Sequence, residues 1–270
     1  MRLINNKNID LSNSLSRGLL ILECFTAKRP RLSPSQIQEL AKIPRATLFR
    51  LLKILTGFGY LKHDEESKKY YLGPSVLHMG FAVLHSMEAR DIIRPYLETL
   101  ARQFNKSIGL LMLDDNEMVY VERVRVPSIR VFNVSVGTRI AVYPTAAGKA
   151  VLAYLDQAKV KQIAGELKKE GKVDIGENGE RLFNSLSEVR RDGYSINDDE
   201  LYKGVRAIAV PLFSSEGVAY AINVTVQPDE VSVYDLRRTY APVLVAIAKK
   251  VSKLLGHQED EELLSEPELA

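Results

Sequence analysis

The sequence predicts an α+β protein in which a winged helix-turn-helix domain precedes a domain built on an antiparallel sheet. Three observations support this prediction. Short helical patterns and a β-prone hairpin occupy residues 1–73, strand-like runs with short polar turns occupy residues 89–256, and positive charge is concentrated in the first of these segments. A length of 270 residues is typical of one large domain or two ordinary ones.

The first domain is strongly basic compared with the rest of the chain. Residues 1–72 contain 13 Lys and Arg against six Asp and Glu, a net charge of +7, whereas the whole chain carries +3. Residues 257–270 contain six acids and no Lys or Arg, which predicts a solvated, disordered tail. This asymmetry indicates a polyanionic partner for the first domain only.

The composition excludes several classes of protein. No apolar run approaches the roughly 18 residues needed to span a membrane, and the first residues lack the apolar core of a secretory signal. We therefore expect a cytoplasmic protein with no membrane partner. The one cysteine, Cys24, has no partner in the chain for a disulfide or a Cys-pair zinc site, and its place beside Phe25 predicts core packing. We expect no cofactor and no metal.

Three short helices are predicted in the first domain. The first covers residues 15–25, where apolar residues recur at helical spacing after the expected cap Ser14. Ser33 and Gln36 frame a proline in the pattern of a capping box, which opens a second helix that ends before Pro44. A leucine stripe predicts a third helix from about Pro44 to a glycine-containing segment. Two helices joined by such a tight turn form a helix-turn-helix.

A β-hairpin is predicted after the third helix. Residues 60–63 and 69–72 are β-prone runs that flank the polar turn 64–68. A hairpin after three helices completes a winged helix-turn-helix. At its tip, Lys68 and Lys69 are candidate phosphate contacts, although a charged hairpin tip is also common on proteins that bind no DNA.

One face of the third helix carries the residues expected to contact DNA. A helical wheel places Ala46, Phe49 and Arg50 opposite the leucine stripe. Arginine can bond a guanine edge through two hydrogen bonds, and alanine or phenylalanine can contact a thymine methyl. The alternative is a solvated surface, but a large aromatic among basic residues favours DNA contact. The predicted DNA contacts are Ser35, Arg45, Ala46, Thr47, Phe49, Arg50, Lys68 and Lys69.

Residues 74–88 are predicted to form a linker helix. The run from Pro74 to Met87 is largely apolar, with His78 and His85 as its polar bulk, and is too apolar for an isolated helix in water. It therefore predicts packing against a second copy of the chain. The two histidines share one helical face, but an interface role is favoured over metal binding because no Cys or Asp lies nearby.

The segment 89–256 predicts a sheet packed with helices. Apolar residues at helical spacing from Ile92 to Phe104 open this domain. Neighbouring strands joined by short polar turns indicate an antiparallel sheet. Strands are expected at residues 107–113, 117–124, 129–136, 206–213 and 218–226, and a long closing helix is expected at residues 231–255.

The segment Thr145–Gly148 predicts a capped helix start with only small residues. Free backbone N–H groups there can bind an anion such as a carboxylate, and small residues also allow close packing on a sheet. The residues alone leave both interpretations open. No Gly-x-Ser-x-Gly elbow is present, and Tyr143 occupies the place of the first glycine of a phosphate loop, so we expect no enzymatic activity.

Several motifs resemble those of IclR-family transcriptional regulators. In the first domain these are Ile43–Leu52 and Gly57–Leu61. In the second domain they follow in the family's order, as Val136–Arg139, Tyr143–Ala150, Gly193–Tyr194 and Gly204–Pro211. The resemblance extends from about residue 15 to residue 256, which is nearly the whole chain.

The resemblance implies a regulator with a GAF-like effector domain behind the linker helix, assembled as a dimer or a dimer of dimers. Its implied partners are double-stranded operator DNA and a small-molecule carboxylate effector. Asn223 and Thr225 are two apart in one predicted strand and therefore face the same side. Carried over by position, the effector site comprises Phe132, Ile140, Ala146, Ala147, Asn197, Val205, Ala207, Asn223 and Thr225.

This chain departs from the family at DNA-facing and effector-facing positions. Ala46 and Phe49 stand where the family commonly has Ser and His, which favours contacts with thymine methyls. Asn197 stands where some relatives have Asp, which removes a charge that would repel a second carboxylate. We therefore expect a small, largely apolar carboxylate with its anion at the amides of Ala146 and Ala147.

Two other functions fit the sequence. One is a constitutive architectural DNA binder whose second domain only dimerises, and the other is a DNA-associated enzyme that turns over a small molecule. A thermal-shift screen of organic acids, combined with operator binding, separates them, because an effector stabilises the fold and changes DNA affinity. Repression and activation both fit, since the sign of regulation depends on promoter position.

Overall fold

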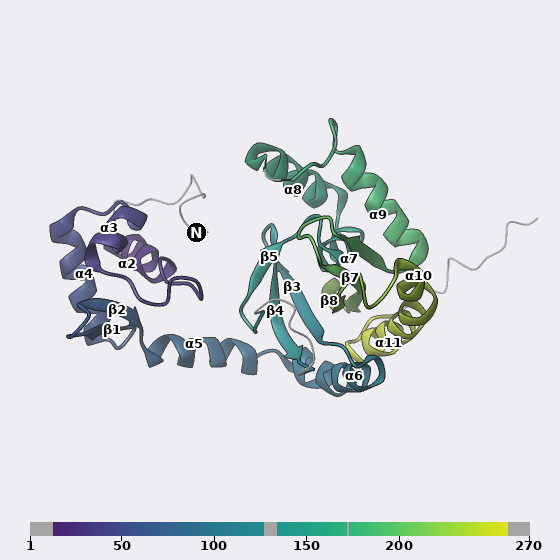
Figure 1. The fold of residues 1–270 in the computed structure, drawn as a ribbon, viewed down its shortest axis with the longest axis horizontal. Helices are drawn as coiled ribbons and strands as arrows, with labels where there is room; N and C mark the ends of the chain where they lie inside the picture. The colour runs from purple at the N-terminus through teal and green to yellow at the C-terminus, as the bar shows by residue number, and fades with distance from the viewer. Residues whose placement is uncertain (1–12, 127–133, 172, 259–270) are drawn as a thin grey trace, which may run out of the picture. The chain divides into compact units, whose positions relative to one another are not determined.

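The computed structural model describes residues 13–126, 134–171 and 173–258 (Figure 1). The chain divides into two compact units, Met1–Ser86 and Met87–Ala270, each with its own hydrophobic core. Within the described ranges, every helix is too short or too polar to cross a membrane.

The first unit is a winged helix-turn-helix followed by one further helix. Its elements in order are α2 (Ser14–Glu23), α3 (Pro34–Ala41), α4 (Arg45–Gly57), β1 (Leu61–Asp64), β2 (Lys69–Leu72) and α5 (Pro74–His85). Strands β1 and β2 pair antiparallel, with Leu61 opposite Leu72. The core between the helices is built from Ile21, Cys24, Ile37, Leu48, Leu52 and Leu61, among others.

The helix boundaries follow local capping chemistry. The predicted capping box is confirmed, because the Ser33 side chain accepts from the Gln36 amide while the Gln36 side chain accepts from the Ser33 amide. The predicted cap of the first helix is wrong. Asn13 Oδ1 accepts the Ser16 amide at 2.8 Å, so Ser14 is the first helical residue instead of the cap.

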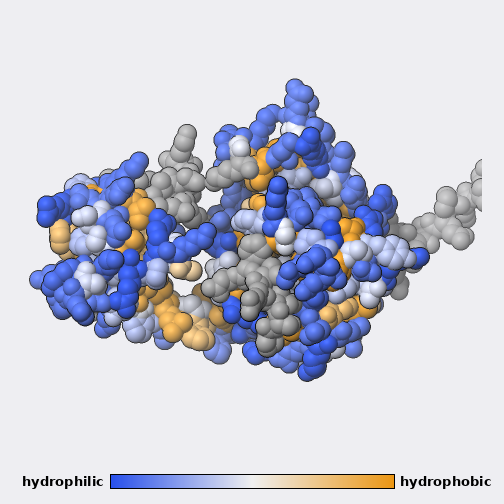
Figure 2. Space-filling model, viewed as in Figure 1, coloured by the Kyte–Doolittle hydropathy of each residue, from blue (hydrophilic) through white to orange (hydrophobic). Residues whose placement is uncertain are grey.

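Helix α5 has no buried residue among its twelve. Its apolar side chains Leu77, Met79, Phe81 and Val83 are between 53% and 63% exposed. Figure 2 shows apolar residues gathered over this helix, in contrast to the largely hydrophilic surface around it. The first unit therefore presents an apolar helix that its own core does not cover.

The second unit is a six-stranded antiparallel sheet with helices on both faces (Figure 1). The strand order is β5-β4-β3-β8-β7-β6. The strands are β3 (Ile108–Asp114), β4 (Glu117–Val124), β5 (Arg139–Ala141), β6 (Ser195–Asp198), β7 (Arg206–Ser214) and β8 (Gly217–Val226). The helices are α6 (Glu88–Phe104), α7 (Ala146–Leu152), α8 (Gln157–Glu170), α9 (Glu180–Asp192), α10 (Val233–Asp235), the π-helix η1 (Leu236–Tyr240) and α11 (Ala241–Leu254).

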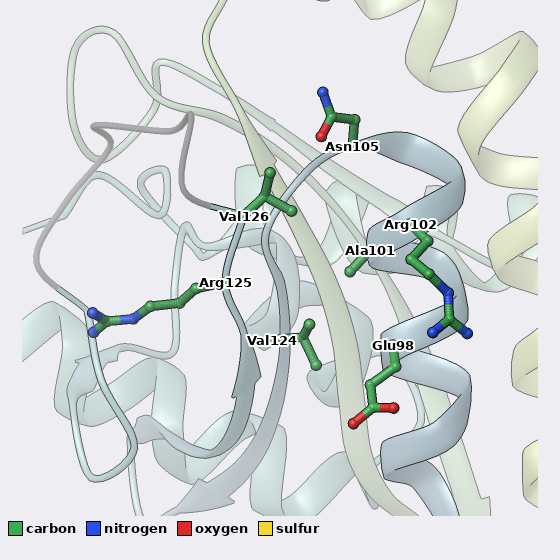
Figure 3. A pocket seen from close by; sticks show the side chains of 7 residues that line it. All are labelled: Glu98, Ala101, Arg102, Asn105, Val124, Arg125 and Val126. Carbon is green, nitrogen blue, oxygen red and sulfur yellow. The ribbon is translucent and has the colours of Figure 1, made fainter.

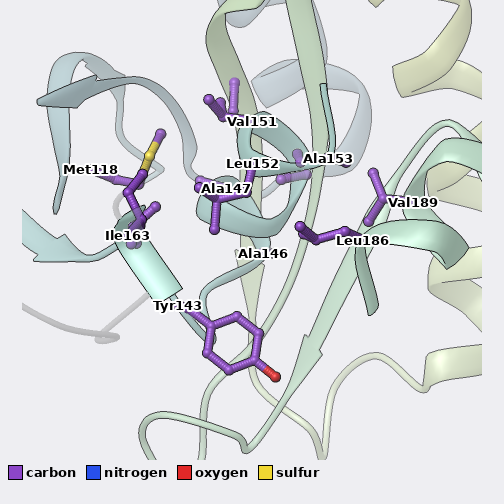
Figure 4. Packing of buried hydrophobic residues seen from close by; sticks show 14 of the residues in the cluster. Met118, Tyr143, Ala146, Ala147, Val151, Leu152, Ala153, Ile163, Leu186 and Val189 are labelled. Carbon is purple, nitrogen blue, oxygen red and sulfur yellow. The ribbon is translucent and has the colours of Figure 1, made fainter. Parts of the chain in front are cut away.

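The alternation of side chains along the strands separates two cores. Ile208 and Val210 of β7 pack in the core of α6 and α11, whereas Ala207 and Ala209 pack in the core of α7, α8 and α9. We call these two sides of the sheet the α6 face and the α7 face. Figure 4 shows the packing on the α7 face, where Ala147 and Leu152 of α7 lie near Leu186 and Val189 of α9.

One strand prediction needs correction, and two strands were missed. Residues 129–133 of the strand expected at 129–136 lie outside the described residues, and residues 134–136 do not form a strand. Strands β5 and β6 were not predicted, because three or four residues at the sheet edges carry too little alternation to be recognised.

The closing helix is helical over Val233–Leu254, but a π turn at η1 interrupts its α-helical bonding.

Candidate DNA-binding surface and effector site

The predicted DNA-facing residues lie on the uncovered side of α4. Leu48, Leu51 and Leu52 are buried, whereas the opposite face is open to solvent. Phe49 is 44% exposed, and the Arg45 guanidinium lies 5.8 Å from the centre of its ring. The structure brings together Arg45, Ala46, Phe49 and Arg50 as exposed residues, with Thr47 half-buried beside them and Ser35 exposed in the first turn of α3.

Arg50 is held by the first helix of the domain. Its Nη2 donates to Ser14 Oγ at 3.2 Å, which joins the recognition helix to the start of α2. Both groups are exposed, so this bond is weak and a phosphate or a base edge can replace it. In the free protein the bond to Ser14 therefore orients the Arg50 side chain, and the guanidinium stays accessible to DNA.

The turn of the wing is held by side-chain hydrogen bonds to its own backbone, and it carries Glu65 and Glu66 beside Lys68 and Lys69. Asp64 Oδ1 accepts the amides of Glu66 and Ser67 at 3.1 and 3.0 Å, and these bonds, the Ser67 amide foremost, lower the pKa of the Asp64 carboxyl. Lys68 adopts a left-handed backbone with φ of 53°, and its Nζ lies 3.2 Å from Glu65 Oε2. Lys68 is exposed in the turn predicted for phosphate contact, and Lys69 is half-buried at the start of β2.

On the α7 face, strand register aligns several predicted effector residues. Asn197 of β6 pairs with Ala207 of β7, and Ala207 pairs with Thr225 of β8. Two pairs further along, on the same face, Asn223 lies between Ala209 of β7 and Gly109 of β3. These residues come from widely separated parts of the chain, and the register places them in two adjacent rows across the sheet.

Asn223 belongs to a small hydrogen-bonded cluster with Tyr120 and Thr225. Asn223 Nδ2 donates to Tyr120 Oη at 3.1 Å and lies 3.4 Å from Thr225 Oγ1. Burial raises the pKa of Tyr120, and the hydrogen bond from Asn223 opposes that shift only in part. The phenol therefore stays neutral at physiological pH. Sequence reasoning missed Tyr120, because only the strand register places it beside Asn223.

The side chain of Asn197 is already bonded. Its Nδ2 donates to the carbonyl of Pro144 at 2.8 Å, and the side chain is buried. In the same strand, Ser195 Oγ donates to the carbonyl of Ala146 at 2.5 Å. Both bonds tie β6 to the start of α7, so they position the predicted anion-binding turn.

The start of α7 is capped and closely packed. The predicted cap is confirmed, because Thr145 Oγ1 accepts the Gly148 amide at 3.2 Å. A Cβ on Gly148 would lie 1.6 Å from the Val142 carbonyl oxygen, so only glycine fits there. Ala146 and Ala147 are buried on the α7 face. The small residues therefore allow close packing at this turn, which is one of the two interpretations that the sequence left open.

Two further predicted effector residues lie outside these two rows. Ile140 is on the edge strand β5, opposite Met118, and packs against the α7-face core. Val205 precedes β7 and donates its amide to Asp199 Oδ1 at 3.1 Å. Phe132 lies outside the described residues.

A buried lysine was also missed. Lys149 of α7 donates to the Ile196 carbonyl at 2.7 Å and to Glu200 Oε1 at 2.6 Å. Its side chain is almost fully enclosed, so the ion pair joins α7 to the loop after β6. No pattern in the sequence marks Lys149 and Glu200 as partners, because they are far apart in the chain.

A separate hollow of about 400 Å³ opens between α6 and the end of β4 (Figure 3). It is lined by Glu98, Ala101, Arg102, Asn105, Val124, Arg125 and Val126. Val124 points toward α6, while Arg125 points away to the other side of the strand (Figure 3). None of the predicted site residues lines this hollow.

Comparison with known families now assigns the two domains. Residues 14–65 match the IclR helix-turn-helix domain, and residues 81–253 match the domain described as bacterial transcriptional regulator IclR C-terminal. The chain belongs to the IclR family. The predicted winged helix-turn-helix and antiparallel-sheet effector domain are thereby confirmed, and this IclR protein is a DNA-binding transcription regulator.

Individual relatives match over most of their length. The Pca regulon regulatory protein of Pseudomonas putida is 30% identical over 243 residues, 89% of this chain and 83% of that protein. The p-hydroxybenzoate hydroxylase transcriptional activator of Acinetobacter baylyi is 29% identical, with 91% and 93% of the two chains aligned. The crystal structure of an IclR family transcriptional regulator from Brucella abortus shares the fold, with a TM-score of 0.78, 23% identity, and 93% and 95% of the chains aligned.

Proposed function

We propose that this IclR protein is a ligand-responsive regulator that binds operator DNA through α4 and the wing and senses a small organic acid on the α7 face of its sheet. The observation that carries the proposal is the alignment, on that face, of one row containing Asn197, Ala207 and Thr225 with a second row containing Ala209 and Asn223. Asn223 and Thr225 stand there beside Ala207 and Ala209, so the face combines polar groups with small apolar side chains.

The DNA-binding part of the proposal rests on α4 and the wing. Arg50 is the side chain proposed to reach base edges, since it is exposed and, within the described part of the chain, its side chain is bonded only to Ser14. Phe49 and Ala46 are proposed to meet thymine methyls. Ser35, Arg45, Thr47, Lys68 and Lys69 complete the proposed contacts, with the lysines on phosphates.

The effector is proposed to be a small carboxylate, aromatic or short aliphatic. Ile140 and Phe132 would contact its apolar body, and the amides of Ala146 and Ala147 would face its acid group. Asn197 and Val205 border the proposed site, and Asn197 is neutral, so one negative charge is accommodated more easily than it would be beside an aspartate. The name of the Acinetobacter relative, an activator for p-hydroxybenzoate hydroxylase, supports an aromatic acid.

Helix α5 is proposed to pair with α5 of a second copy. Its apolar side chains occur on all sides of the helix, and a helix of that kind is stable only when neighbours cover it. A second copy supplies an identical apolar surface, and a dimer of dimers would cover more of it. Paired recognition helices would then read two half-sites.

The function is tested by selecting binding sites for the full-length protein from random DNA and then titrating organic acids into the selected complex. We expect one enriched site with two related halves, and a change of affinity of about fivefold or more with at least one acid. Unchanged affinity with every acid would favour a constitutive DNA binder. Consumption of an acid without any change in DNA affinity would favour an enzyme.

The pocket is tested by two substitutions in the second domain. Ala146→Asp places a negative charge at the proposed anion position and should abolish the acid response while DNA binding persists. Because Ala146 is buried, the thermal midpoint of that variant is measured first. Thr225→Val keeps the shape and removes one hydroxyl, so it should weaken the response without unfolding the domain. A normal response in both variants would contradict this pocket.

The dimer is tested by Phe81→Glu in α5, with Leu254→Glu in α11 as the matched control. Both residues are about half exposed, so neither change disrupts a core. Sedimentation should show dissociation of the Phe81→Glu variant and an unchanged mass for the Leu254→Glu variant. Equal behaviour of the two variants would exclude α5 as the principal interface.

A further inference from the structure

Arg123 lies on the α7 face beside the Tyr120–Asn223 cluster because β4 contains a bulge. Tyr120 pairs with Leu111, whereas Glu122 pairs with Leu110, so Val121 is an extra residue in the strand. The bulge leaves Tyr120 and Arg123 on the same side of the sheet. The Arg123 guanidinium lies 5.7 Å from the centre of the Tyr120 ring.

The positive charge of Arg123 is not balanced by the described part of the chain. Its Nε is shielded from solvent and has no hydrogen-bond partner there. Burial lowers the pKa of the Arg123 guanidinium, Tyr120 opposes this shift, and the positive charge of Arg125 adds to it. No carboxylate of the described residues is among these causes. An arginine nevertheless stays protonated in a protein, so the enclosed positive charge lowers the stability of the fold.

The neighbouring charged side chains are already engaged. Glu122 faces α6, where its Oε2 lies 2.7 Å from Arg90 Nη2. Arg125 donates to the Val134 carbonyl at 2.6 Å and to Ser135 Oγ at 3.1 Å. Unlike Glu122, Arg123 has no ion-pair partner among the described residues, and its enclosed Nε donor has no acceptor, which is uncommon for a buried polar group.

We propose that Arg123 binds the acid group of the effector, so that the site takes a compact monocarboxylate. This inference rests on the proposed function, but it assigns the acid group to the Arg123 guanidinium instead of the amides of Ala146 and Ala147. Asn223 and Thr225 lie on the same face of the sheet as Arg123, and they offer hydrogen bonds to a polar group of the same molecule. One unbalanced guanidinium matches one carboxylate.

The first test needs no ligand. Arg123→Met keeps most of the volume and removes the charge, so the thermal midpoint of the full-length protein without added acid should stay the same or rise. Arg125→Met, the matched control, removes two hydrogen bonds and should lower the midpoint. A clear loss of stability in Arg123→Met would show a structural role for Arg123 and overturn the proposal.

The second test uses benzoate, 4-hydroxybenzoate and butyrate as probes and benzamide as the neutral control, with binding measured by titration calorimetry. At least one acid should bind the wild type, benzamide should not, and Arg123→Met should weaken the binding of that acid about tenfold to a hundredfold. Arg123→Lys should retain part of the affinity because the charge remains, and Arg125→Met should bind as the wild type does.

Each other outcome counts against the proposal. Equal binding by the wild type and Arg123→Met would leave the amides of Ala146 and Ala147 as the anion position. Binding of benzamide as tightly as benzoate, or of none of the three acids, would exclude a carboxylate. Because neither test contains DNA, their failure is distinct from a failure of the regulator to recognise an operator.

Discussion

Asn223 Nδ2 lies 3.1 Å from Tyr120 Oη, although the two residues belong to strands on opposite sides of β3. They meet because the residue between them is Gly109. A Cβ at Gly109 would lie 2.4 Å from Asn223 Oδ1 and 2.5 Å from Tyr120 Cε1. The absence of a side chain at this one position thus permits the polar cluster on the α7 face.

Gly109→Ala should therefore destabilise the second domain. Both neighbours are buried, so they have to shift, and overpacking of this kind typically costs about 1–3 kcal/mol. The free energy of unfolding in urea measures the loss. Gly165→Ala in α8 is the matched control, because its Cβ would meet nothing within 4 Å and alanine is favoured in helices. Equal destabilisation by both changes would refute the steric explanation.

Arg50→Ala should reduce affinity for the selected DNA site by about 1–3 kcal/mol and leave affinity for random DNA nearly unchanged. The reason is that a base-reading side chain contributes chiefly to sequence discrimination. Fluorescence anisotropy on both DNAs measures the difference, and Arg94→Ala on α6 provides a surface control. A similar loss on both DNAs would assign Arg50 to a phosphate.

Lys68→Asn should weaken binding to all DNA sequences alike. Asparagine tolerates the left-handed backbone that Lys68 adopts, so the turn is preserved while one positive charge is removed. If Lys68 meets a phosphate, the slope of log K against log salt should fall by roughly 0.9. An unchanged slope would mean that the wing tip stays in solvent.

Phe49→His should change the preferred DNA sequence. Phe49 presents an exposed ring next to Arg45, and a ring of this type can contact a thymine methyl but cannot bond a base edge. Imidazole adds a donor or an acceptor at the same position. Binding sites selected for the variant and the wild type are compared by sequencing, and identical sites would show that Phe49 only packs against Arg45.

Cys24 should resist alkylation in the folded protein. It is fully buried, and burial raises the pKa of its thiol to about 11. A raised pKa keeps the thiol protonated at pH 8, where the reactive thiolate is then scarce. Mass spectrometry after iodoacetamide treatment should show little product in buffer and full labelling in urea. Rapid labelling in buffer would indicate that the first domain opens readily.

Much of the first domain follows from local sequence, because its signals act over a few residues. The capping box at Ser33 and Gln36 is complete within four residues, and the leucine stripe of α4 repeats at helical spacing. The start of α2 was misplaced by one residue because Asn13 and Ser14 are both good caps. In the structure, Asn13 has the extended backbone of a cap residue, and Ser14 is already helical.

The effector site depends far more on tertiary structure. Sequence alone places Asn223 and Thr225 on one side of a strand, since side chains alternate with a period of two. It does not show that Tyr120 bonds Asn223 over Gly109, or that Lys149 pairs with Glu200. The position of Arg123 depends on a bulge whose extra residue is visible only from the pairing of β4 with β3. Helices and hairpins are encoded by short-range periodicity and capping, whereas a site across a sheet is formed by strand pairing between distant segments, and that pairing comes from the packing of the whole domain.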